Sequence, residues 1–359
     1  MIVFIQMPGH AYTHRDLVHL THQAPRRRGW TFGTAKSDID QSLRAHARFA
    51  VKIRDYEWLI RERSLPPAVY VFTDRERMDV WQLRVFSGFF RHINALGPGY
   101  RAINDPARMC DRVSLLRTLH TRGLNPFNVY RLDELPDNIT FPVFIRRAFD
   151  HGFPFDDLLH SRAALDAVIQ RLQAGGEPAA GVIVTEFCGA PVDERSGLYR
   201  KLAAYRIDDE VFFFNTGHEP NWNVKYGKHA SAPAELYAEE QAFIENNAFQ
   251  TEAAGVFEAG GIHYGRLDFG LVAGKPVFYE INTNPHISLK PQAHPNPIRQ
   301  KNIEAGRIKY LEALSKLEDT TERSPRTLAK RGVRVFNHAY IQQHWVRGVG
   351  MFNRRLWRP

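Results

Sequence analysis

Cysteine is scarce in this 359-residue sequence, which contains only Cys110 and Cys188. The two lie far apart, so they offer neither a disulfide framework nor the close spacing of a zinc site. We therefore expect a reducing, cytoplasmic compartment. Long apolar runs are also missing, because none reaches the ~18 residues that would cross a membrane. The first residues, MIVFIQMPGHA, lack a charged leader and a cleavage site, and they predict a core strand rather than a signal peptide.

Most of the chain has no excess of either charge. The net charge is +9, but residues 322–359 carry nine basic side chains against one acidic one, which leaves +1 for everything before them. The near-neutral body argues against a nucleic-acid-binding protein. The predicted tail, 319–359, also contains five aromatic residues. We expect these to pack on the chain's own body or on a second subunit of a homo-oligomer, with a nucleic acid, a membrane surface or a protein partner as alternatives.

Strand-like and helix-like patterns alternate in the first part of the chain, and later the strands follow one another closely. This order predicts a fold between α/β and α+β with a partly antiparallel sheet. The predicted lobes are 1–103, 104–178 and 179–318. Strands are expected at 2–5, 69–72, 143–145, 182–187, 203–207, 211–214, 267–272 and 277–281, and helices at 79–95, 106–122, 161–174, 235–259 and 299–317.

The stretch RLDFGLVAGKPVFYEIN (266–282) predicts a hairpin with polar residues on one face. Side chains alternate across a strand, so Arg266 and Asp268 share a face, as do Glu280 and Asn282. A three-residue loop at 273–275 would pair Asp268 with Glu280 and Arg266 with Asn282, whereas a two-residue loop would put the two carboxylates on opposite faces. The pattern fits either a solvated face, with Arg266 neutralising Asp268, or a Mg²⁺ site built from carboxylate and amide oxygens.

The sequence RLDFG…FYEINTNP resembles the terminal motif of the ATP-grasp superfamily, which includes D-alanine ligases, glutathione synthetases and ribosomal-protein glutamate ligases. Those enzymes join a carboxylate to an amine through an acyl-phosphate and consume ATP. The resemblance implies an N-terminal α/β lobe and two further lobes whose antiparallel sheets sandwich ATP. It also implies Mg²⁺ ligands at Asp268, Glu280 and Asn282, and a catalytic role for Arg266 on the transferred phosphoryl group.

Four upstream segments resemble other parts of the same nucleotide site in the same order. INDPARMCDRVSLLRTLHTRGLNPF (103–127) resembles the entry helix of the middle lobe, FPVFIRRAFDHGFP (141–154) a phosphate-binding strand with its flap, VIVTEFCGAPVD (182–193) the adenine hinge, and NWNVKYG (221–227) a lysine-donating segment. Arginine replaces the usual lysine at two of these positions. The implied nucleotide-binding residues are Arg112, Arg146, Glu186, Phe187, Cys188, Asp193 and Lys225. Arg112 and Arg146 could instead be surface or salt-bridge residues, and Glu186 could merely cap a sheet edge.

The predicted function is therefore an ATP-dependent ligase that forms a C–N bond between small-molecule or peptide carboxylate and amine substrates and releases ADP and phosphate. On the extended run GLYRKLAAYRI (197–207), Arg200 and Arg206 share a face and could hold an anionic substrate, although solvated sheet charges are an equal alternative. The two lysine-to-arginine replacements keep a second hypothesis open, an ATP-binding scaffold or regulatory protein without ligase turnover.

Overall fold

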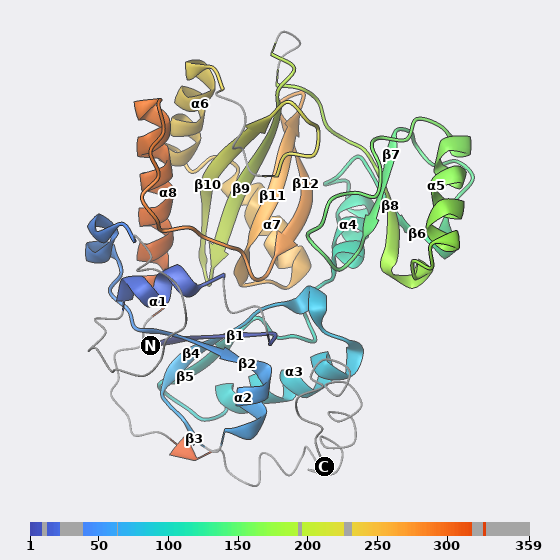
Figure 1. Cartoon of the computed structure of the whole chain (residues 1–359). Helices are drawn as coiled ribbons and strands as arrows, with labels where there is room; N and C mark the ends of the chain where they lie inside the picture. The colour runs from blue at the N-terminus through green and yellow to red at the C-terminus, as the bar shows by residue number, and fades with distance from the viewer. Residues whose placement is uncertain are drawn as a thin grey trace.

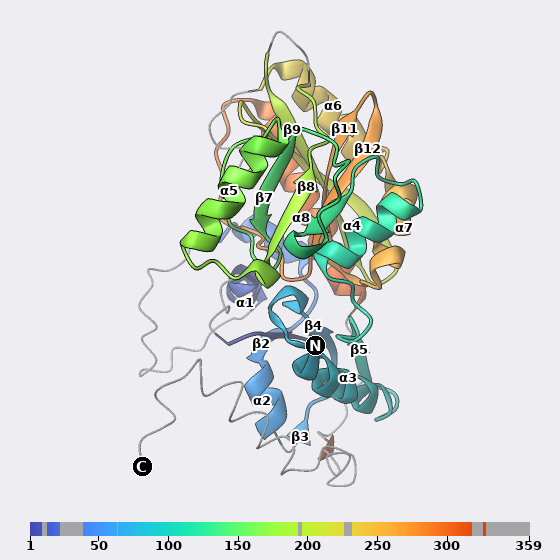
Figure 2. The same ribbon diagram turned by 90° about the vertical axis from the view of Figure 1, so that its right-hand side faces the viewer.

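The computed structural model describes residues 1–8, 13–21, 39–62, 64–192, 196–225, 232–317 and 326–327. The predicted nucleotide-binding residue Asp193 lies outside these ranges. So does the predicted basic tail, apart from the short strand β13 (Arg326–Thr327), which pairs with β3 (Ser64–Leu65). The described ranges form three packed lobes (Figures 1 and 2). None of their helices is long and apolar enough to span a membrane.

The N-terminal lobe contains a four-stranded parallel sheet in the order β2-β1-β4-β5. Strands β1 and β4 are buried on both faces, which explains their continuous apolar sequences IVFIQ and AVYVF. One face packs against α2 and α3, and the other packs against α1 and the C-terminal lobe. The elements are β1 (Ile2–Gln6), α1 (Arg15–Thr21), β2 (Val51–Asp55), α2 (Tyr56–Arg61), β4 (Ala68–Phe72), α3 (Val80–Asn94) and β5 (Tyr100–Ile103).

The middle lobe contains a three-stranded antiparallel sheet in the order β6-β8-β7, flanked by two helices. Its elements are α4 (Arg112–Thr121), β6 (Val129–Arg131), β7 (Val143–Arg147), α5 (Arg162–Ala174) and β8 (Val182–Glu186). Because β8 is hydrogen-bonded between β6 and β7, this sheet extends past the predicted lobe boundary at residue 178.

The C-terminal lobe contains a four-stranded antiparallel sheet in the order β10-β9-β11-β12. The predicted helix over 235–259 is two helices in the structure. Asn247, at a left-handed φ of 49°, interrupts it, and its side chain accepts from the amide of Phe213 and donates to the carbonyl of Val211. The elements are β9 (Tyr199–Ile207), β10 (Glu210–Glu219), α6 (Ala234–Glu245), α7 (Gln250–Gly260), β11 (Tyr264–Val272), β12 (Lys275–Asn282) and α8 (Pro297–Lys316).

In the hairpin of β11 and β12 the pairing of Asp268 with Glu280 is as predicted, but the loop length is not. Its connection is the two-residue turn Ala273–Gly274, both at positive φ, and not the predicted three-residue loop. That turn alone would place the two carboxylates on opposite faces. A β-bulge at Tyr279 adds one residue to β12 and restores the alignment, so that Asp268 is paired with Glu280.

Candidate functional site

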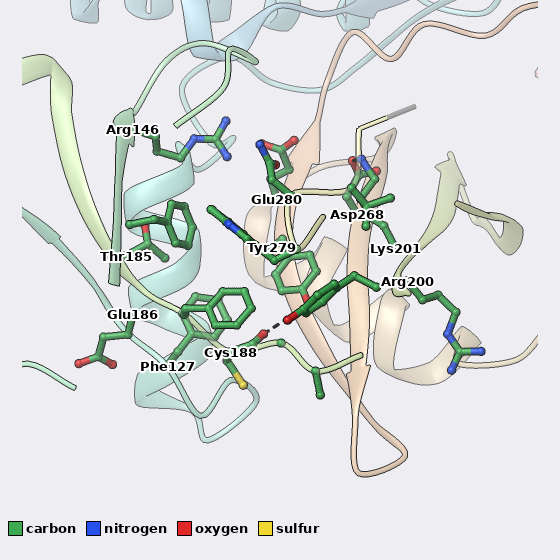
Figure 3. Close-up of a pocket in the computed structure, with 18 of the residues that line it drawn as sticks. Phe127, Arg146, Thr185, Glu186, Cys188, Arg200, Lys201, Asp268, Tyr279 and Glu280 are labelled. Atoms are coloured by element: carbon green, nitrogen blue, oxygen red, sulfur yellow. Dashed lines mark hydrogen bonds and ion pairs between the residues drawn. The ribbon is translucent and has the colours of Figure 1, made fainter. Parts of the chain in front are cut away.

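A cavity of about 1010 Å³, its open mouth included, lies between the three-stranded and four-stranded antiparallel sheets (Figure 3). One part of its wall is apolar and partly aromatic. The bulged Tyr279 belongs to this part, and its hydroxyl donates to the carbonyl of Cys188 at 3.4 Å. Its ring lies over Gly270, where an added Cβ would collide with the hydroxyl oxygen. The other apolar lining residues include Leu116, Phe127, Phe144, Phe187 and Leu271.

The opposite part of the wall is basic, and three elements and the segment after β10 contribute to it. Arg112 is the first residue of α4, Arg146 lies on β7, Lys201 on β9 and Lys225 after β10. The Nη2 of Arg146 donates to a backbone carbonyl at 3.2 Å, while its Nε is buried and has no partner in the described part of the chain. Burial and the neighbouring Arg112 charge lower the pKa of Arg146 to about 10, so it stays protonated at neutral pH.

A second cavity lies against β9, β10 and β11, and Asp268 lines both it and the first cavity. Its carboxylate accepts two hydrogen bonds from Arg266, at 2.7 and 3.1 Å, and lies 3.3 Å from the Nζ of Lys201. Burial opposes ionisation, but the charges of Arg266 and Lys201 outweigh it and lower the pKa of Asp268. The side chain is therefore a buried anion compensated by two cations.

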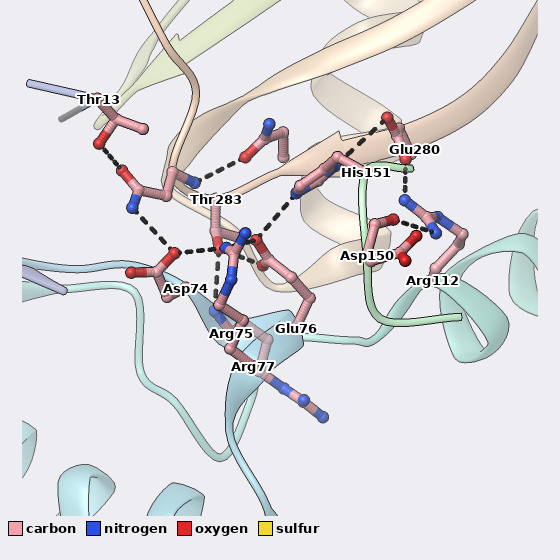
Figure 4. A network of polar contacts seen from close by, with 12 residues as sticks. Thr13, Asp74, Arg75, Glu76, Arg77, Arg112, Asp150, His151, Glu280 and Thr283 are labelled. Atoms are coloured by element: carbon pink, nitrogen blue, oxygen red, sulfur yellow. Dashed lines mark hydrogen bonds and ion pairs between the residues drawn. The ribbon is translucent and has the colours of Figure 1, made fainter. Parts of the chain in front are cut away.

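Glu280 is compensated by a separate set of basic groups (Figure 4). Arg112 forms an ion pair with one carboxylate oxygen, and the Nδ1 of His151 lies 3.9 Å from the other. Burial again acts against ionisation, yet the neighbouring cations hold the pKa of Glu280 well below its usual range. The Nε2 of His151 also lies 3.2 Å from Glu76 of the N-terminal lobe. Burial works against protonation of His151, but hydrogen bonds to both glutamates raise its pKa to about 9.

Two antiparallel sheets enclose a cavity with an apolar part and a basic part, and strands carrying Arg266–Asp268 and Glu280–Asn282 border its basic part. This is the arrangement that the ATP-grasp resemblance implied, an N-terminal α/β lobe and two lobes whose antiparallel sheets enclose a cavity. Neither a family model nor a curated protein sequence matches the chain.

Solved structures similar to it include D-alanine–D-alanine ligase from Bacillus anthracis, with a TM-score of 0.49 and 11% identity over 94% of this chain and 99% of that one. A RimK domain ATP-grasp protein from Sphaerobacter thermophilus gives a TM-score of 0.45 and 12% identity over 89% and 100% of the two chains. An L-amino acid ligase from Bacillus licheniformis gives a TM-score of 0.38 and 12% identity over 88% of this chain and 77% of that one.

The residues of the predicted adenine hinge line the cavity, but the carboxylate of Glu186 is engaged elsewhere. Glu186 ends β8, and its carboxylate accepts from the amides of Asn128 at 2.8 Å and Thr140 at 2.9 Å and from the hydroxyl of Tyr130 at 3.0 Å. The side chain points away from the basic part of the cavity in Figure 3. Its carboxylate therefore joins β8 to its neighbours, and the backbone at Phe187 and Cys188 is left to line the cavity.

The structure does not bring Arg200 and Arg206 together as a substrate clamp. Both lie on the face of the C-terminal sheet that packs against α6 and α7, where Arg200 pairs with Glu239 and Arg206 with Glu258. Arg200, near the start of β9, also lines the first cavity, whereas Arg206 lines neither cavity. Lys201 faces the opposite side, together with Asp268. The predicted alternation along β9 is present, but the sequence did not indicate which part of the strand meets the cavity.

The last two predicted site residues, Lys225 and Asn282, form hydrogen bonds with the backbone. Lys225 donates from its Nζ to the carbonyls of His151 and Gly152, the latter at 2.9 Å, so it holds the start of the flap. The Oδ1 of Asn282 accepts from the amide of Asn284 at 2.9 Å and so shapes the loop after β12.

Sequence reasoning missed a polar junction between the lobes. Glu76 accepts from the hydroxyl of Thr283 at 3.0 Å, and Asp74 accepts from the Nδ2 of Asn284 at 2.9 Å (Figure 4). The only available signal was that Asp74 follows a buried parallel strand, at the sheet edge where α/β folds bind ligands. Nothing in the sequence indicated that its partners would come from the NTNP segment.

Proposed function

We propose that this chain is an ATP-dependent carboxylate–amine ligase that activates an acid as an acyl-phosphate and releases ADP and phosphate. One observation supports this above others. The nucleotide-sized cavity and a second cavity share Lys201, Val224, Lys225 and Asp268 in their walls. A nucleotide and a second substrate bound in the two cavities would therefore meet at a cationic boundary, an arrangement that a scaffold binding only ATP does not need.

The lining chemistry of the first cavity suits ATP. The apolar and aromatic part would hold the base, with the backbone at Phe187 and Cys188 at the hinge. The basic part would hold the triphosphate, with charge-assisted contacts from Arg146, Lys225 and Arg112. Arginine supplies a planar pair of donors where lysine supplies a point charge, so both arginines can serve as phosphate ligands.

The candidate metal ligands fit Mg²⁺ in their chemistry. Among the described residues, no group of three or more His, Cys, Asp and Glu side chains is arranged to hold a metal. Asp268, Glu280 and Asn282 instead offer two carboxylates and one amide, and Mg²⁺ commonly takes one or two carboxylates and completes its shell with water and substrate phosphates. Bound there, the ion would neutralise charge on the β- and γ-phosphates.

The chain's own residues would position the reactants and compensate charge. A carboxylate oxygen of the acid attacks the γ-phosphorus, and the bond to the ADP oxygen breaks. The amine then attacks the acyl carbon, loses a proton and displaces phosphate. Arg266 lines the second cavity and is held in place by its hydrogen bond to Asp268. From there it would stabilise the charge that develops on the acyl oxygen. The mechanism requires no nucleophile from the protein.

The test is a product assay on the full chain with Mg²⁺, ATP and panels of amino acids, other carboxylic acids and short peptides. We expect acid-dependent release of ADP and phosphate, and a hydroxamate when hydroxylamine replaces the amine. Release of AMP and pyrophosphate would instead establish an adenylating mechanism. ATP binding without acid-dependent turnover across the panel would favour the scaffold alternative.

A further inference from the structure

The second cavity has an unusual charge composition. It lies against β9, β10 and β11, and α8 and the loop over 286–292 form its far wall. The described residues that line it include five basic side chains and a single carboxylate, that of Asp268. The basic residues are Lys201, Lys225, Arg266, Arg299 and Arg307. The lining therefore carries more positive charge than a substrate with one carboxylate would require.

The basic residues form two groups at different distances from the nucleotide cavity. Lys201 and Lys225 line both cavities, so they lie at the phosphate end. Arg299 and Arg307 come from α8 and line only the second cavity. They are eight residues apart along the helix, with Ile303 midway, so the three side chains share one face of α8. An acid that reached both groups would need an anionic group at each of its ends.

Arg307 differs from the other arginines of this cavity because no ion pair within 4.0 Å is found for it in the described part of the chain. Arg299 pairs with the buried Glu240, and Arg266 pairs with Asp268. Arg307 is only 4% exposed, and its one hydrogen bond found in the described part of the chain goes to the carbonyl of Lys290, at 2.9 Å. Burial lowers the pKa of Arg307, and the charges of Asp40, Asp16 and Glu304, none of which forms an ion pair with it within 4.0 Å, offset this only in part. A buried guanidinium without a paired anion is costly, and a ligand anion would relieve that cost.

The α8 wall is held at a fixed distance from the sheet. Gly306, next to Arg307, packs so tightly on β10 that an added Cβ would lie 2.6 Å from the carbonyl oxygen of Phe214. Helix α8 also packs against α6 and carries Tyr310 and Leu311 into the core shared with the N-terminal lobe. Arg307 is thus presented from a rigid surface, which favours specific recognition over adaptable contact.

We propose that the acid substrate is dianionic, with its reacting carboxylate at the Lys201 end of this cavity and a second carboxylate or phosphate held by Arg307. This deepens the proposed ligase function and rests on it for the identity of the reacting end. Arg307 is then a specificity-determining residue, while Arg266 and Lys201 act at the reacting end. Monocarboxylic acids of similar length would lack the group that neutralises Arg307.

The experiment compares acids that differ only in the distal group. Glutarate and 4-phosphonobutyrate are tested against butyrate, which shares their carbon chain, with the full chain and Mg·ADP, by titration calorimetry. The same acids are then tested with Mg·ATP and hydroxylamine for ADP and hydroxamate formation. We expect an acid with a distal anionic group to bind at least tenfold more tightly than butyrate, and the preferred one of glutarate and 4-phosphonobutyrate distinguishes a distal carboxylate from a phosphorus oxyanion. Equal binding of dianions and monoanions would overturn the proposal.

The variant Arg307→Met removes the proposed contact, and Arg206→Met is the matched control, because Arg206 is similarly buried but faces α7. We expect Arg307→Met to raise the Kd and KM for the preferred dianion at least tenfold, with kcat, ADP affinity and monoanion binding unchanged, and Arg307→Lys to restore part of the affinity. Arg206→Met should leave all of them unchanged. If Arg307→Met does not fold, Ser288→Asp, which adds a repelling charge to the half-buried cavity wall, should weaken the dianion by a similar factor.

Two failures can be told apart. Tight dianion binding that depends on Arg307, without ADP release, would support the anion site and refute the ligase function. Acid-dependent ADP release with no preference for dianions, or an Arg307→Met variant with unchanged dianion affinity, would leave the ligase standing and refute the anion site.

Discussion

Replacing Glu280 with glutamine tests whether the paired carboxylates repel each other or are held by cations. A bare pair of like charges directly opposite across two strands is destabilising, so removing one charge would raise the melting temperature. The structure gives the opposite expectation. Glu280 forms an ion pair with Arg112 and lies near His151, and its pKa is held well below the usual range by these groups. The Glu280→Gln variant without ligands should therefore be less stable than the wild type.

The size of the effect follows from the hydrogen bonding of this side chain. A hydrogen bond to a charged group contributes ~1.5–3 kcal/mol, and the glutamine oxygen can keep a neutral hydrogen bond worth ~0.5–1.5 kcal/mol. The net destabilisation is then ~1–2 kcal/mol, which corresponds to a fall in Tm of ~1–3 °C for a chain of this size. Because the folded-state pKa is depressed, the wild-type advantage is fully present above the ordinary pKa of 4.5 and fades as the pH falls below it.

The assay is thermal unfolding of both proteins without ligand at pH 7 and near pH 4, followed by ADP titrations with and without Mg²⁺. Glu134→Gln is the control, because Glu134 also pairs with an arginine, Arg117, but at an exposed site. In Glu280→Gln the ratio of ADP affinities with and without Mg²⁺ should fall toward one, while the control keeps the wild-type ratio. A Glu280→Gln protein that melts higher and keeps the Mg²⁺ effect would refute both the charge compensation and the metal assignment.

Three further predictions concern neighbouring residues. Arg146→Ala should weaken ATP binding about tenfold or more, because it removes a charge-assisted bond to phosphate, and Arg146→Lys should retain most of the affinity; unchanged affinity in the alanine variant would make Arg146 a structural residue. Gly270→Ala should lower the free energy of unfolding by ~1–3 kcal/mol and weaken nucleotide binding, because the added Cβ displaces the Tyr279 ring. Adding Tyr279→Phe should recover part of both effects, since the Tyr279 hydroxyl is the atom nearest to that Cβ. His151→Gln should be less stable than wild type, with the full difference present below pH 6.5 and the difference fading as the pH rises through 9. The reason is that, despite burial, hydrogen bonds to the two glutamates raise the folded-state pKa of His151 to about 9. A pH-independent difference in Tm would contradict a charged His151.

Some of the site could be predicted because its signals are local. Alternation along a strand places Arg266 with Asp268 and Glu280 with Asn282, whatever the rest of the chain does. The order of strand-like and helix-like patterns likewise indicated a fold between α/β and α+β with a partly antiparallel sheet. The pairing of Asp268 with Glu280 was reached from a wrong loop length, however, because a two-residue turn and the bulge at Tyr279 compensate each other. A bulge depends on how the strand meets its surroundings, here Tyr279 over Gly270, and no local pattern announces it.

The sequence by itself determined which residues are available and which of them share a face of a strand or helix, because these follow from backbone geometry over a few residues. Only the tertiary structure decided which face meets a ligand cavity and which charges are already compensated. It turned Arg200 and Arg206 toward carboxylates of α6 and α7, engaged the carboxylate of Glu186 with backbone amides, and left Arg307 without a close counter-ion among the described residues. Ion pairing depends on distances between segments far apart in the chain, and these distances are set by how the sheets and helices pack.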